Sequence, residues 1–347
     1  MARKLALPAA IAAMTLALTA CNGDNGDNGD NSDDNGNGGD ASSLPDLREE
    51  YGGDDWPTEL QFVSIPSEDQ VELAVQYEVL IEMFEEALDV TIESDEVTAY
   101  AAAIEALGAG TADIANFGPF SYVVAADTAG AQSVAVAVSE QDEEPSYVSY
   151  LVTLSDNDEI NGIEDVAGKT VCFVDEVSTS GRLYPLAGLM DAGVLPQGEE
   201  GVENEEEYID PYLAGAHDNS VLAVLDGTCD AGFAYDNIVD EQMIAAGDLE
   251  EGQVKVVWES EDIPSSPFAA SGNLPDDMIE AMREILIDYL NVEWLAENGY
   301  CEDTDTETGD CRHLVPTNDW GYTEATDSVF DGIRAVCEVT QATACEG

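Results

Sequence analysis

The chain has 347 residues, which is long enough for two domains of ordinary size. Its hydrophobic fraction of 44% is normal for a globular protein, but 75 Asp and Glu against 9 Lys and Arg give a formal net charge of -66. A surface this negative disfavours nucleic acid and anionic membrane as binding partners, because both carry the same sign of charge.

The acidic residues occur in the expected helices as well as in the loops, so they do not form an acidic tail. Self-repulsion of this size is relieved in molar salt, where the Debye length falls to roughly 3 Å. We therefore hypothesise that the source is a halophile. Unfolding measured against NaCl concentration tests this hypothesis, and full stability in about 10 mM salt would contradict it.

Residues 1–20 have the pattern of a signal peptide, with two basic residues ahead of the apolar run Leu5–Leu18. The run ends in Leu-Thr-Ala-Cys, which resembles the lipobox of bacterial and archaeal lipoproteins and predicts a lipidated Cys21. Residues 21–54 are rich in Asn, Gly and Asp and are predicted to form a disordered acidic linker that tethers the folded part to the membrane. The alternative is a soluble secreted protein in which Cys21 has no such role.

The cysteines that follow the linker are even in number, which in an exported chain predicts three disulfides. Short loops favour the pairs Cys301–Cys311 and Cys337–Cys345, which leaves Cys172 and Cys229 to pair with each other. None of these residues has zinc-finger spacing, so no metal site is predicted.

Strands and helices alternate after the linker, which predicts an α/β fold with largely parallel sheets. Apolar residues at helical spacing indicate the helices, and short β-branched runs indicate the strands. The first predicted elements are a strand from Leu60 to Pro66, a helix capped by Ser67 and reaching Leu88, a strand from Val90 to Ser94, a helix from Ala99 to Leu107, a strand from Asp113 to Gly118 and a helix opened by Pro119.

A second α/β group follows an extended segment, and a further extended segment leads back to the first group. Two lobes joined by two crossings make a hinged clamshell, in which a ligand binds in the cleft between the lobes. The second group of elements is the crossing Tyr147–Leu154, strands at Val171–Val174, Cys229–Ala234 and Val254–Trp258, a helix at Ser220–Leu225, the crossing Ile263–Phe268 and helices within Asp276–Glu297. The predicted boundaries are 55–150 for the first lobe, 151–262 for the second, and 263–347 for a return to the first lobe with a disulfide-stapled C-terminal region.

The turn Ser178-Thr-Ser-Gly181 lies between a short apolar strand and an apolar helix. Its hydroxyls lie where the first helical N–H groups lack partners and where the helix dipole is positive, so the turn predicts a site for a tetrahedral oxyanion. The alternative is an ordinary helix cap that binds nothing. Arg182 is expected to point away from the site, toward solvent or a carboxylate. Hydrogen bonds and dipoles are then expected to neutralise the anion.

Several stretches between about Leu60 and about Leu290 together resemble, in their order and spacing, the phosphate/phosphite/phosphonate-binding proteins of ABC importers. This family is periplasmic-binding-protein-like, of type II. The resemblance implies a two-lobed clamshell, each lobe a mostly parallel sheet flanked by helices, with two crossing hinge strands. The stretches are Tyr100–Leu107, Asp113–Tyr122, Tyr147–Val152, Ile163–Lys169, Ser178–Gly181, Gly215–Val224 and Ile263–Pro267.

The resemblance implies that the turn holds the phosphoryl oxygens and that His217 donates to the same anion. Tyr100 and Tyr147 would close over the ligand from the first lobe and the hinge. From the residues alone, His217 also fits a neutral histidine near a helix start, and both tyrosines fit core aromatics. The ligand-binding residues expected on these grounds are Ser178, Thr179, Ser180, His217, Tyr100, Tyr147 and Asp236.

Members of the family that bind aminoalkyl phosphonates place carboxylates against the ligand amine. The matching segments here read Tyr235-Asp-Asn and Ser265-Ser-Pro. The second segment offers no carboxylate, and in the first either Asp236 or Asn237 is the replacement. This departure disfavours 2-aminoethylphosphonate and favours phosphate, phosphite or methylphosphonate.

The predicted function is that of a substrate-binding lipoprotein on the outer face of the cell membrane, which captures a phosphorus oxyanion and delivers it to an ABC permease. We expect a monomer with no cofactor and no enzymatic activity. The alternatives are a sensory or surface lipoprotein of the same fold, binding of another anion such as sulfate or a carboxylate, and a hydrolase using Ser178 or Ser180 with His217. The Gly-x-Ser-x-Gly elbow expected of many hydrolases is absent around Ser180.

Overall fold

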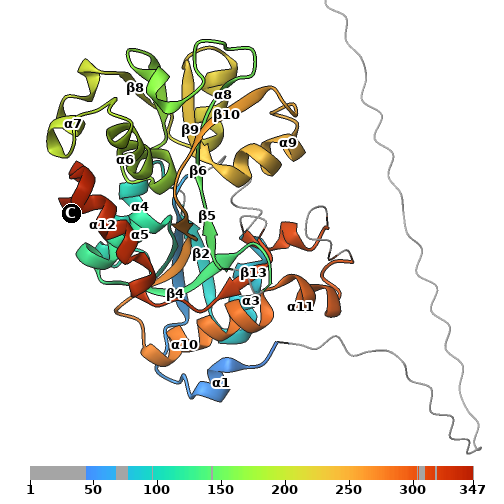
Figure 1. Cartoon of the computed structure of the whole chain (residues 1–347). Coiled ribbons are helices and arrows are strands. Elements are labelled where there is room, and N and C mark those ends of the chain that lie inside the picture. The colour runs from blue at the N-terminus through green and yellow to red at the C-terminus, as the bar shows by residue number, and fades with distance from the viewer. Residues whose placement is uncertain are drawn as a thin grey trace, which may run out of the picture. The chain divides into compact units, whose positions relative to one another are not determined.

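The computed structural model describes residues 44–67, 77–95, 97–141, 144–302, 304, 309–316 and 319–346, all within one compact unit, Ala41–Gly347 (Figure 1). The predicted signal peptide, the predicted lipidation site Cys21 and residues 21–43 of the predicted linker lie outside the described residues. Among the helices of the described ranges, none is long and apolar enough to cross a membrane.

The first lobe is the lower part of Figure 1 and is built on a mixed sheet. Among the described residues this sheet has six strands, in the order β13 (Gly321–Thr323), β4 (Ala131–Val138), β12 (Pro267–Ser271), β3 (Ile114–Asn116), β1 (Glu59–Ser64) and β2 (Thr91–Asp95). Its helices are α1 (Leu47–Tyr51), α3 (Glu78–Leu88), α4 (Tyr100–Ala109), α5 (Pro119–Ala129), α10 (Asp276–Glu284) and α11 (Val292–Glu297). Phe62 and Phe268 stack in its core, with ring centroids 6.0 Å apart.

The second lobe is the upper part of Figure 1 and has a sheet of its own. In the described part of the chain its five strands follow the order β10 (Val254–Glu259), β6 (Ser149–Leu154), β9 (Ala231–Tyr235), β7 (Thr170–Phe173) and β8 (Asp210–Leu213). Its helices are α6 (Tyr184–Asp191), α7 (Glu199–Glu203), α8 (His217–Leu225) and α9 (Met243–Ala246).

The predicted two-lobed α/β fold is confirmed, but the sheets are mixed rather than mostly parallel. The strand β1 pairs in parallel with β2 and β3, and β7 pairs in parallel with β8 and β9. All ladders made by β12 and by β6 are antiparallel. These two strands come directly from the other lobe, without the helical crossover that parallel neighbours need, and so they enter each sheet in the opposite direction.

Two extended segments join the lobes, as predicted. The short strand β5 (Ser146–Tyr147) leads into β6, and β11 (Ile263–Pro264) leads into β12. These two segments pair with each other in an antiparallel ladder, with Tyr147 opposite Ile263. The hinge is therefore a small two-stranded ribbon that continues into both sheets.

The C-terminal helix α12 (Asp331–Thr340) corrects the prediction that residues 263–347 return to the first lobe alone. It contacts α5 of the first lobe and α6 and α7 of the second, and it lies beside α5 in Figure 1. Ile333 and Val336 of α12 join a core cluster that includes Phe120 from the first lobe and Leu186 from the second. The apolar stripe of this helix thus packs into a core that both lobes share.

Polar contacts hold α12 to each lobe. The Arg334 guanidinium pairs with the Asp127 carboxylate of α5 at 3.1 Å. Gln341, just past the helix, accepts the backbone N–H of Glu199 of α7 through Oε1 at 3.3 Å. The C-terminal segment is therefore bonded to both sides of the hinge.

The folded part begins before residue 54, where the predicted linker ends. Leu47 of α1 is fully buried and Leu44 is nearly so. The Arg48 guanidinium donates to the carbonyl oxygens of Leu88 at 2.8 Å and Pro57 at 2.6 Å. Burial of two leucines and these hydrogen bonds order a segment whose composition predicted disorder.

The three predicted disulfide pairs are confirmed: Cys172–Cys229, Cys301–Cys311 and Cys337–Cys345. The first joins β7 to the residues just before β9 inside the second lobe. The other two close short loops with sequence separations of 10 and 8 residues. Such cross-links stabilise mainly by restricting the unfolded chain.

Candidate functional site

A cavity of about 380 Å³ lies between the lobes, and the structure brings all seven predicted ligand-binding residues to its lining. We distinguish two groups of residues in this lining, the neutral hydrogen-bonding side chains around the Ser178–Gly181 turn and the more exposed carboxylates. The inner wall consists of the mostly buried residues Tyr100, Tyr147, Ser178, Thr179, Ser180 and His217. The rim consists of four more exposed carboxylates, Glu140, Asp240, Glu241 and Asp319.

The Ser178–Gly181 turn of the inner wall is held from both of its sides. Ser178 is the N-cap, and its Oγ accepts the backbone N–H of Gly181 at 3.1 Å. From strand β6 of the second lobe, the Ser149 hydroxyl donates to the carbonyl of Ser180 at 2.6 Å. A Cβ on Gly181 would lie 2.3 Å from Val174, so the turn requires glycine there. Thr179 to Gly181 of the turn are the first residues of a π-helical segment, Thr179–Leu183, which runs directly into α6.

The lobes touch at the inner wall. Thr179 of the second lobe accepts the backbone N–H of Phe120, at the start of α5, through Oγ1 at 2.8 Å. The backbone N–H of His217 donates to the carbonyl of Ser67 of the first lobe at 2.9 Å. The two lobes therefore enclose the inner wall together, and hydrogen bonds cross from one to the other beside it.

Three helices begin at the cavity without a cap from the side chain of their own N-cap residue, although Thr179 Oγ1 accepts the Phe120 N–H and the Ser67 carbonyl accepts the His217 N–H. Tyr100 starts α4, Gly118 precedes α5 and His217 starts α8, and all three residues line the cavity. The cap residues Ala99, Gly118 and Ala216 have no side-chain acceptor for the first-turn N–H groups. Together with the Ser178 turn, the positive ends of several helix dipoles thus converge on one space. This arrangement suits an oxyanion.

His217 is a neutral hydrogen-bond donor. Its imidazole is 4% exposed, and burial lowers its pKa to about 3. The backbone N–H of Tyr235 donates to Nδ1 at 3.3 Å, so in the neutral ring the proton is on Nε2. Nε2 lies 3.5 Å from Ser178 Oγ, at the inner wall. His217 can therefore donate to a ligand without carrying charge.

Tyr147 contributes a hydroxyl from the hinge. Burial raises the pKa of Tyr147, and hydrogen bonds with Ser180 and Thr179 oppose part of this increase. Its ring packs edge-on against Tyr235, with centroids 6.4 Å apart. The hydroxyl thus keeps its proton and belongs to the same hydrogen-bonded group as the turn.

Arg182 does not line the cavity, in agreement with the prediction that it points away. Its Nη1 and Nη2 donate to the two oxygens of Glu205 at 2.9 and 2.8 Å, and its Nε donates to Glu176 at 3.0 Å. The guanidinium also lies 4.6 Å from the ring centroid of Phe173. Arg182 therefore anchors the back of the turn to the second lobe.

Sequence reasoning missed Arg312, which does line the cavity. Its side chain is buried and donates through Nη2 to the carbonyl of Ser139 at 3.3 Å. Arg312 follows Cys311 directly, so the Cys301–Cys311 disulfide fixes the loop that carries it. That neighbouring disulfide was the only available signal, because nothing around Arg312 resembles a binding motif.

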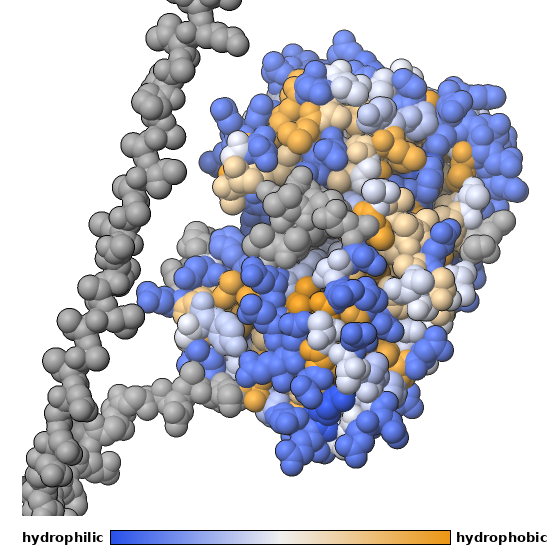
Figure 2. Space-filling model, turned by 180° about the vertical axis from the view of Figure 1, so that it is seen from behind, coloured by the Kyte–Doolittle hydropathy of each residue, from blue (hydrophilic) through white to orange (hydrophobic). Residues whose placement is uncertain are grey.

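Cations are scarce throughout the described residues, and each one has a polar partner within the chain. Hydrophilic side chains dominate the face shown in Figure 2, as the net charge of -66 predicts. The partnered cations are Arg48, Lys169, Arg182, Lys255, Arg283, Arg312 and Arg334. The six residues of the inner wall are neutral, and the buried Arg312 is the one cation among the described residues that line the cavity.

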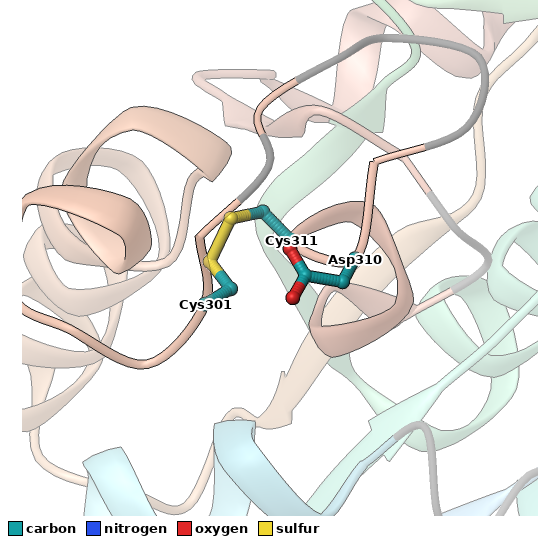
Figure 3. Close-up of side chains that lie close together, drawn as sticks. All are labelled: Cys301, Asp310 and Cys311. Atoms are coloured by element: carbon teal, nitrogen blue, oxygen red, sulfur yellow. A yellow bond between two sulfur atoms is a disulfide. The ribbon is translucent and has the colours of Figure 1, made fainter.

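Asp310 lies close to the sulfur atoms of Cys301 and Cys311, as Figure 3 shows. The two sulfurs are joined in a disulfide and offer no thiolate. A single carboxylate then remains as a strong ligand, and this grouping is not a metal centre.

A hinged pair of α/β lobes with a donor-lined cavity between them defines a solute-binding protein. Residues 62–301 match the family described as "ABC transporter, phosphonate, periplasmic substrate-binding protein". The chain belongs to this family. It is therefore an extracytoplasmic substrate-binding protein of the phosphate/phosphonate ABC importers.

Curated relatives and solved structures agree with this assignment. The chain is 39% identical to the phosphate-import protein PhnD of Mycolicibacterium smegmatis over 308 residues, which cover 88% of this chain and 94% of that protein. It is 26% identical to the phosphonates-binding periplasmic protein of Escherichia coli, with 66% of each chain covered. The structure of PhnD1 from Prochlorococcus marinus in complex with methylphosphonate has a TM-score of 0.64 at 18% identity, covers 81% of this chain and 98% of that one, and supports the fold.

Proposed function

We propose that the inner wall binds a phosphorus oxyanion, namely phosphate, phosphite or a small phosphonate, and that hinge closure holds it for delivery to a permease. The observation that carries this proposal is the convergence of helix N-termini and the Ser178–Gly181 turn on one cavity, where Arg312 is the single cationic side chain among the described lining residues. The hydroxyls, the imidazole N–H and the backbone amides supply hydrogen bonds to the ligand oxygens, and the helix dipoles offset its charge. The relative of 39% identity, described as a phosphate-import protein, supports the ligand class.

The same geometry argues against the hydrolase alternative. A serine nucleophile needs a base that can take its proton. Nε2 of His217, 3.5 Å from Ser178 Oγ, already holds a proton because Nδ1 accepts the N–H of Tyr235. His217 is thus oriented to donate rather than to accept, which favours binding without bond chemistry.

Calorimetric titration in molar salt tests the proposal. The protein is the chain from Asn22 onward, which keeps the buried Leu44 and Leu47, and the ligands are phosphate, phosphite, methylphosphonate and 2-aminoethylphosphonate. We expect tight binding of at least one of the first three. The Ser180→Ala variant should bind that ligand about 5- to 150-fold more weakly, which corresponds to about 1–3 kcal/mol.

Ser155→Ala is the matched control, because its hydroxyl bonds to the carbonyl of Gly252 on the second lobe and does not line the cavity. It should bind as the wild type does. If none of the four ligands gives a heat of binding, the protein shares the fold of its family but binds a different ligand.

We also propose that Cys21 carries a lipid that holds the protein at the outer face of the cell membrane, with the acidic segment after it as a tether. The lipobox-like sequence and the extracytoplasmic family support this proposal. In cells, the wild-type protein should sediment with membranes, and the Cys21→Ala variant should be released. Equal distribution of the two proteins would rule the anchor out.

A further inference from the structure

Asn116 is a buried polar residue of the cavity lining that sequence reasoning did not single out. It is the last residue of β3, it is 7% exposed, and its side chain lines the cavity. Its backbone carbonyl accepts the N–H of Ile65 at 3.3 Å, but its side-chain amide bonds to no residue of the described chain. A primary amide offers two donors and one acceptor, and burial of such a group without partners is costly. An amide in this position calls for a partner from the ligand.

The end of β3 lies close to the Ser178–Gly181 turn, on the other side of the cavity. Gly118 approaches the turn so closely that a Cβ on it would lie 3.4 Å from Thr179 Oγ1. Asn116 precedes Gly118 by two residues, which span at most roughly 7 Å of chain. Asn116 belongs to the first lobe and the turn to the second. A ligand held by the turn therefore has the Asn116 amide within reach on its opposite side.

The sheet of the first lobe holds Asn116 in a fixed place. Its strand β3 lies between β12 and β1, and Asn116 is opposite Phe268 of the first and Ser64 of the second. Phe117, which follows, is fully buried, and its N–H donates to the carbonyl of Pro267 at 3.2 Å. The amide is uncharged, so it cannot distinguish ligands by their charge. It can distinguish them by whether the group that faces it forms a hydrogen bond.

We propose that Asn116 is a specificity-determining residue of the cleft, whose amide recognises the fourth substituent of a phosphorus oxyanion bound through its other three oxygens at the Ser178–Gly181 turn. A P–OH group bonds to the amide, whereas a P–CH3 group leaves the amide buried without a partner. The cleft then favours phosphate over methylphosphonate. This inference rests on the proposed function and narrows its ligand class.

Phosphate and methylphosphonate differ at this one substituent. At about pH 9, well above the second pKa of a phosphoryl group, each carries a doubly charged PO3 group, with a hydroxyl as the fourth substituent in phosphate and a methyl in methylphosphonate. The charge and the three oxygens offered to the turn are then the same. In calorimetric titration in molar salt, the wild-type protein should bind phosphate at least about tenfold more tightly than methylphosphonate.

The variant that tests the amide is Asn116→Leu, which keeps the branched shape of the side chain and removes its polar atoms. Phosphate affinity should fall about 5- to 150-fold because the ligand hydroxyl loses its partner. Methylphosphonate affinity should stay the same or rise, so the phosphate-to-methylphosphonate affinity ratio should fall at least about fivefold. Asn116→Ala should lower the ratio in the same direction, and it provides the test if the larger leucine disturbs the fold.

Asn298→Leu is the matched control. It also removes an amide, but this amide bonds to the carbonyl of Trp294 at 2.8 Å and does not line the cavity. Both affinities should remain those of the wild type. Circular dichroism and thermal unfolding of each variant confirm that changes in affinity do not arise from loss of fold.

The outcomes separate this inference from the proposal on which it rests. A purely structural role of Asn116 would weaken both ligands by the same factor, and an unchanged ratio would overturn the inference while phosphate binding by the wild type upholds the proposed function. Equal affinity of the wild type for the two ligands would overturn it as well. If the wild type binds neither phosphate, phosphite nor methylphosphonate, the proposed function fails and the inference fails with it.

Hydroxymethylphosphonate tests whether the amide recognises a polar group further from phosphorus. Under the inference it should bind more weakly than phosphate. If it binds more tightly than phosphate, and Asn116→Leu removes that gain, the amide serves a hydroxyl on a longer substituent and the inference is overturned.

Discussion

The inner wall and the rim belong to the same cavity but have opposite electrostatic character. The inner wall is neutral and donates hydrogen bonds from hydroxyls, an imidazole and backbone amides. The rim carries carboxylates such as Asp240 and Glu241, which are exposed to solvent. In a chain of net charge -66, short-range hydrogen bonds, helix dipoles and the buried Arg312 of the cavity lining must supply the affinity for an anion, while the long-range field opposes its approach. Affinity and approach are thus controlled by separate residues.

The largest expected effect comes from the inner wall. His217→Ala removes a neutral donor and should weaken phosphate binding by about 1–3 kcal/mol, or about 5- to 150-fold, in calorimetric titration. His217→Gln offers an amide N–H in a similar place and should recover part of the loss. Because burial lowers the pKa of His217 to about 3, protonation of this ring should add no affinity between about pH 8 and pH 5. Wild-type affinity in both variants would place the site elsewhere.

A smaller effect concerns the stability of the ligand-free protein. Burial raises the pKa of Asp236 from 3.8 to about 6, so the folded state binds this proton more tightly than the unfolded state. The ionised carboxylate therefore costs stability above about pH 6, and the cost disappears below about pH 4, where both states are protonated. Asp236→Asn should raise the free energy of unfolding by on the order of 1 kcal/mol at about pH 8 and leave it unchanged at about pH 4.

Guanidinium chloride unfolding at the two pH values measures this difference. An equal gain at both pH values would mean that the substitution changes packing and not the cost of a buried charge.

The smallest expected effect comes from the rim. Neutralising two carboxylates with Asp240→Asn and Glu241→Gln should speed association of phosphate about two- to threefold at the lowest salt in which the fold persists. The gain should vanish in molar salt, and the dissociation rate should stay the same. Stopped-flow measurements separate the two rates. A changed dissociation rate would show that the rim contacts the bound ligand, and would remove the distinction between the two parts of the cavity.

The sequence predicted those features that depend on local rules. The Ser178 cap and its turn follow from residue preferences at a helix start, and the structure has them as expected. The interpretation that Arg182 points away from the site, toward solvent or a carboxylate, also followed from its place just past a cap, and in the structure Glu205 and Glu176 provide carboxylates. Short-loop cysteine pairing was equally local.

Features that depend on distant parts of the chain were missed. Arg312 reaches the cavity because its loop packs against residues far earlier in the chain, such as Ser139. Leu47 lies in a polar stretch, and it is buried because α1 packs against α10 and α3, which come much later or separately in the chain. The antiparallel entry of β6 and β12 depends on the hinge geometry, which no local periodicity encodes. The position of Arg312, the burial of Leu47 and the direction of β6 and β12 all depend on packing between residues that are far apart in the sequence.

The position of the C-terminal helix α12 against both lobes affects the apparent affinity of the protein for its ligands. This helix contacts α5 in the first lobe and α6 and α7 in the second lobe. Opening and closing of the two lobes must therefore change the contacts of α12. An apparent affinity is the intrinsic affinity scaled by the population of the competent conformer. Substitutions at Gln341 that alter this population would change the affinities for all ligands by one common factor, whereas substitutions in the cavity would change the ratios between ligands.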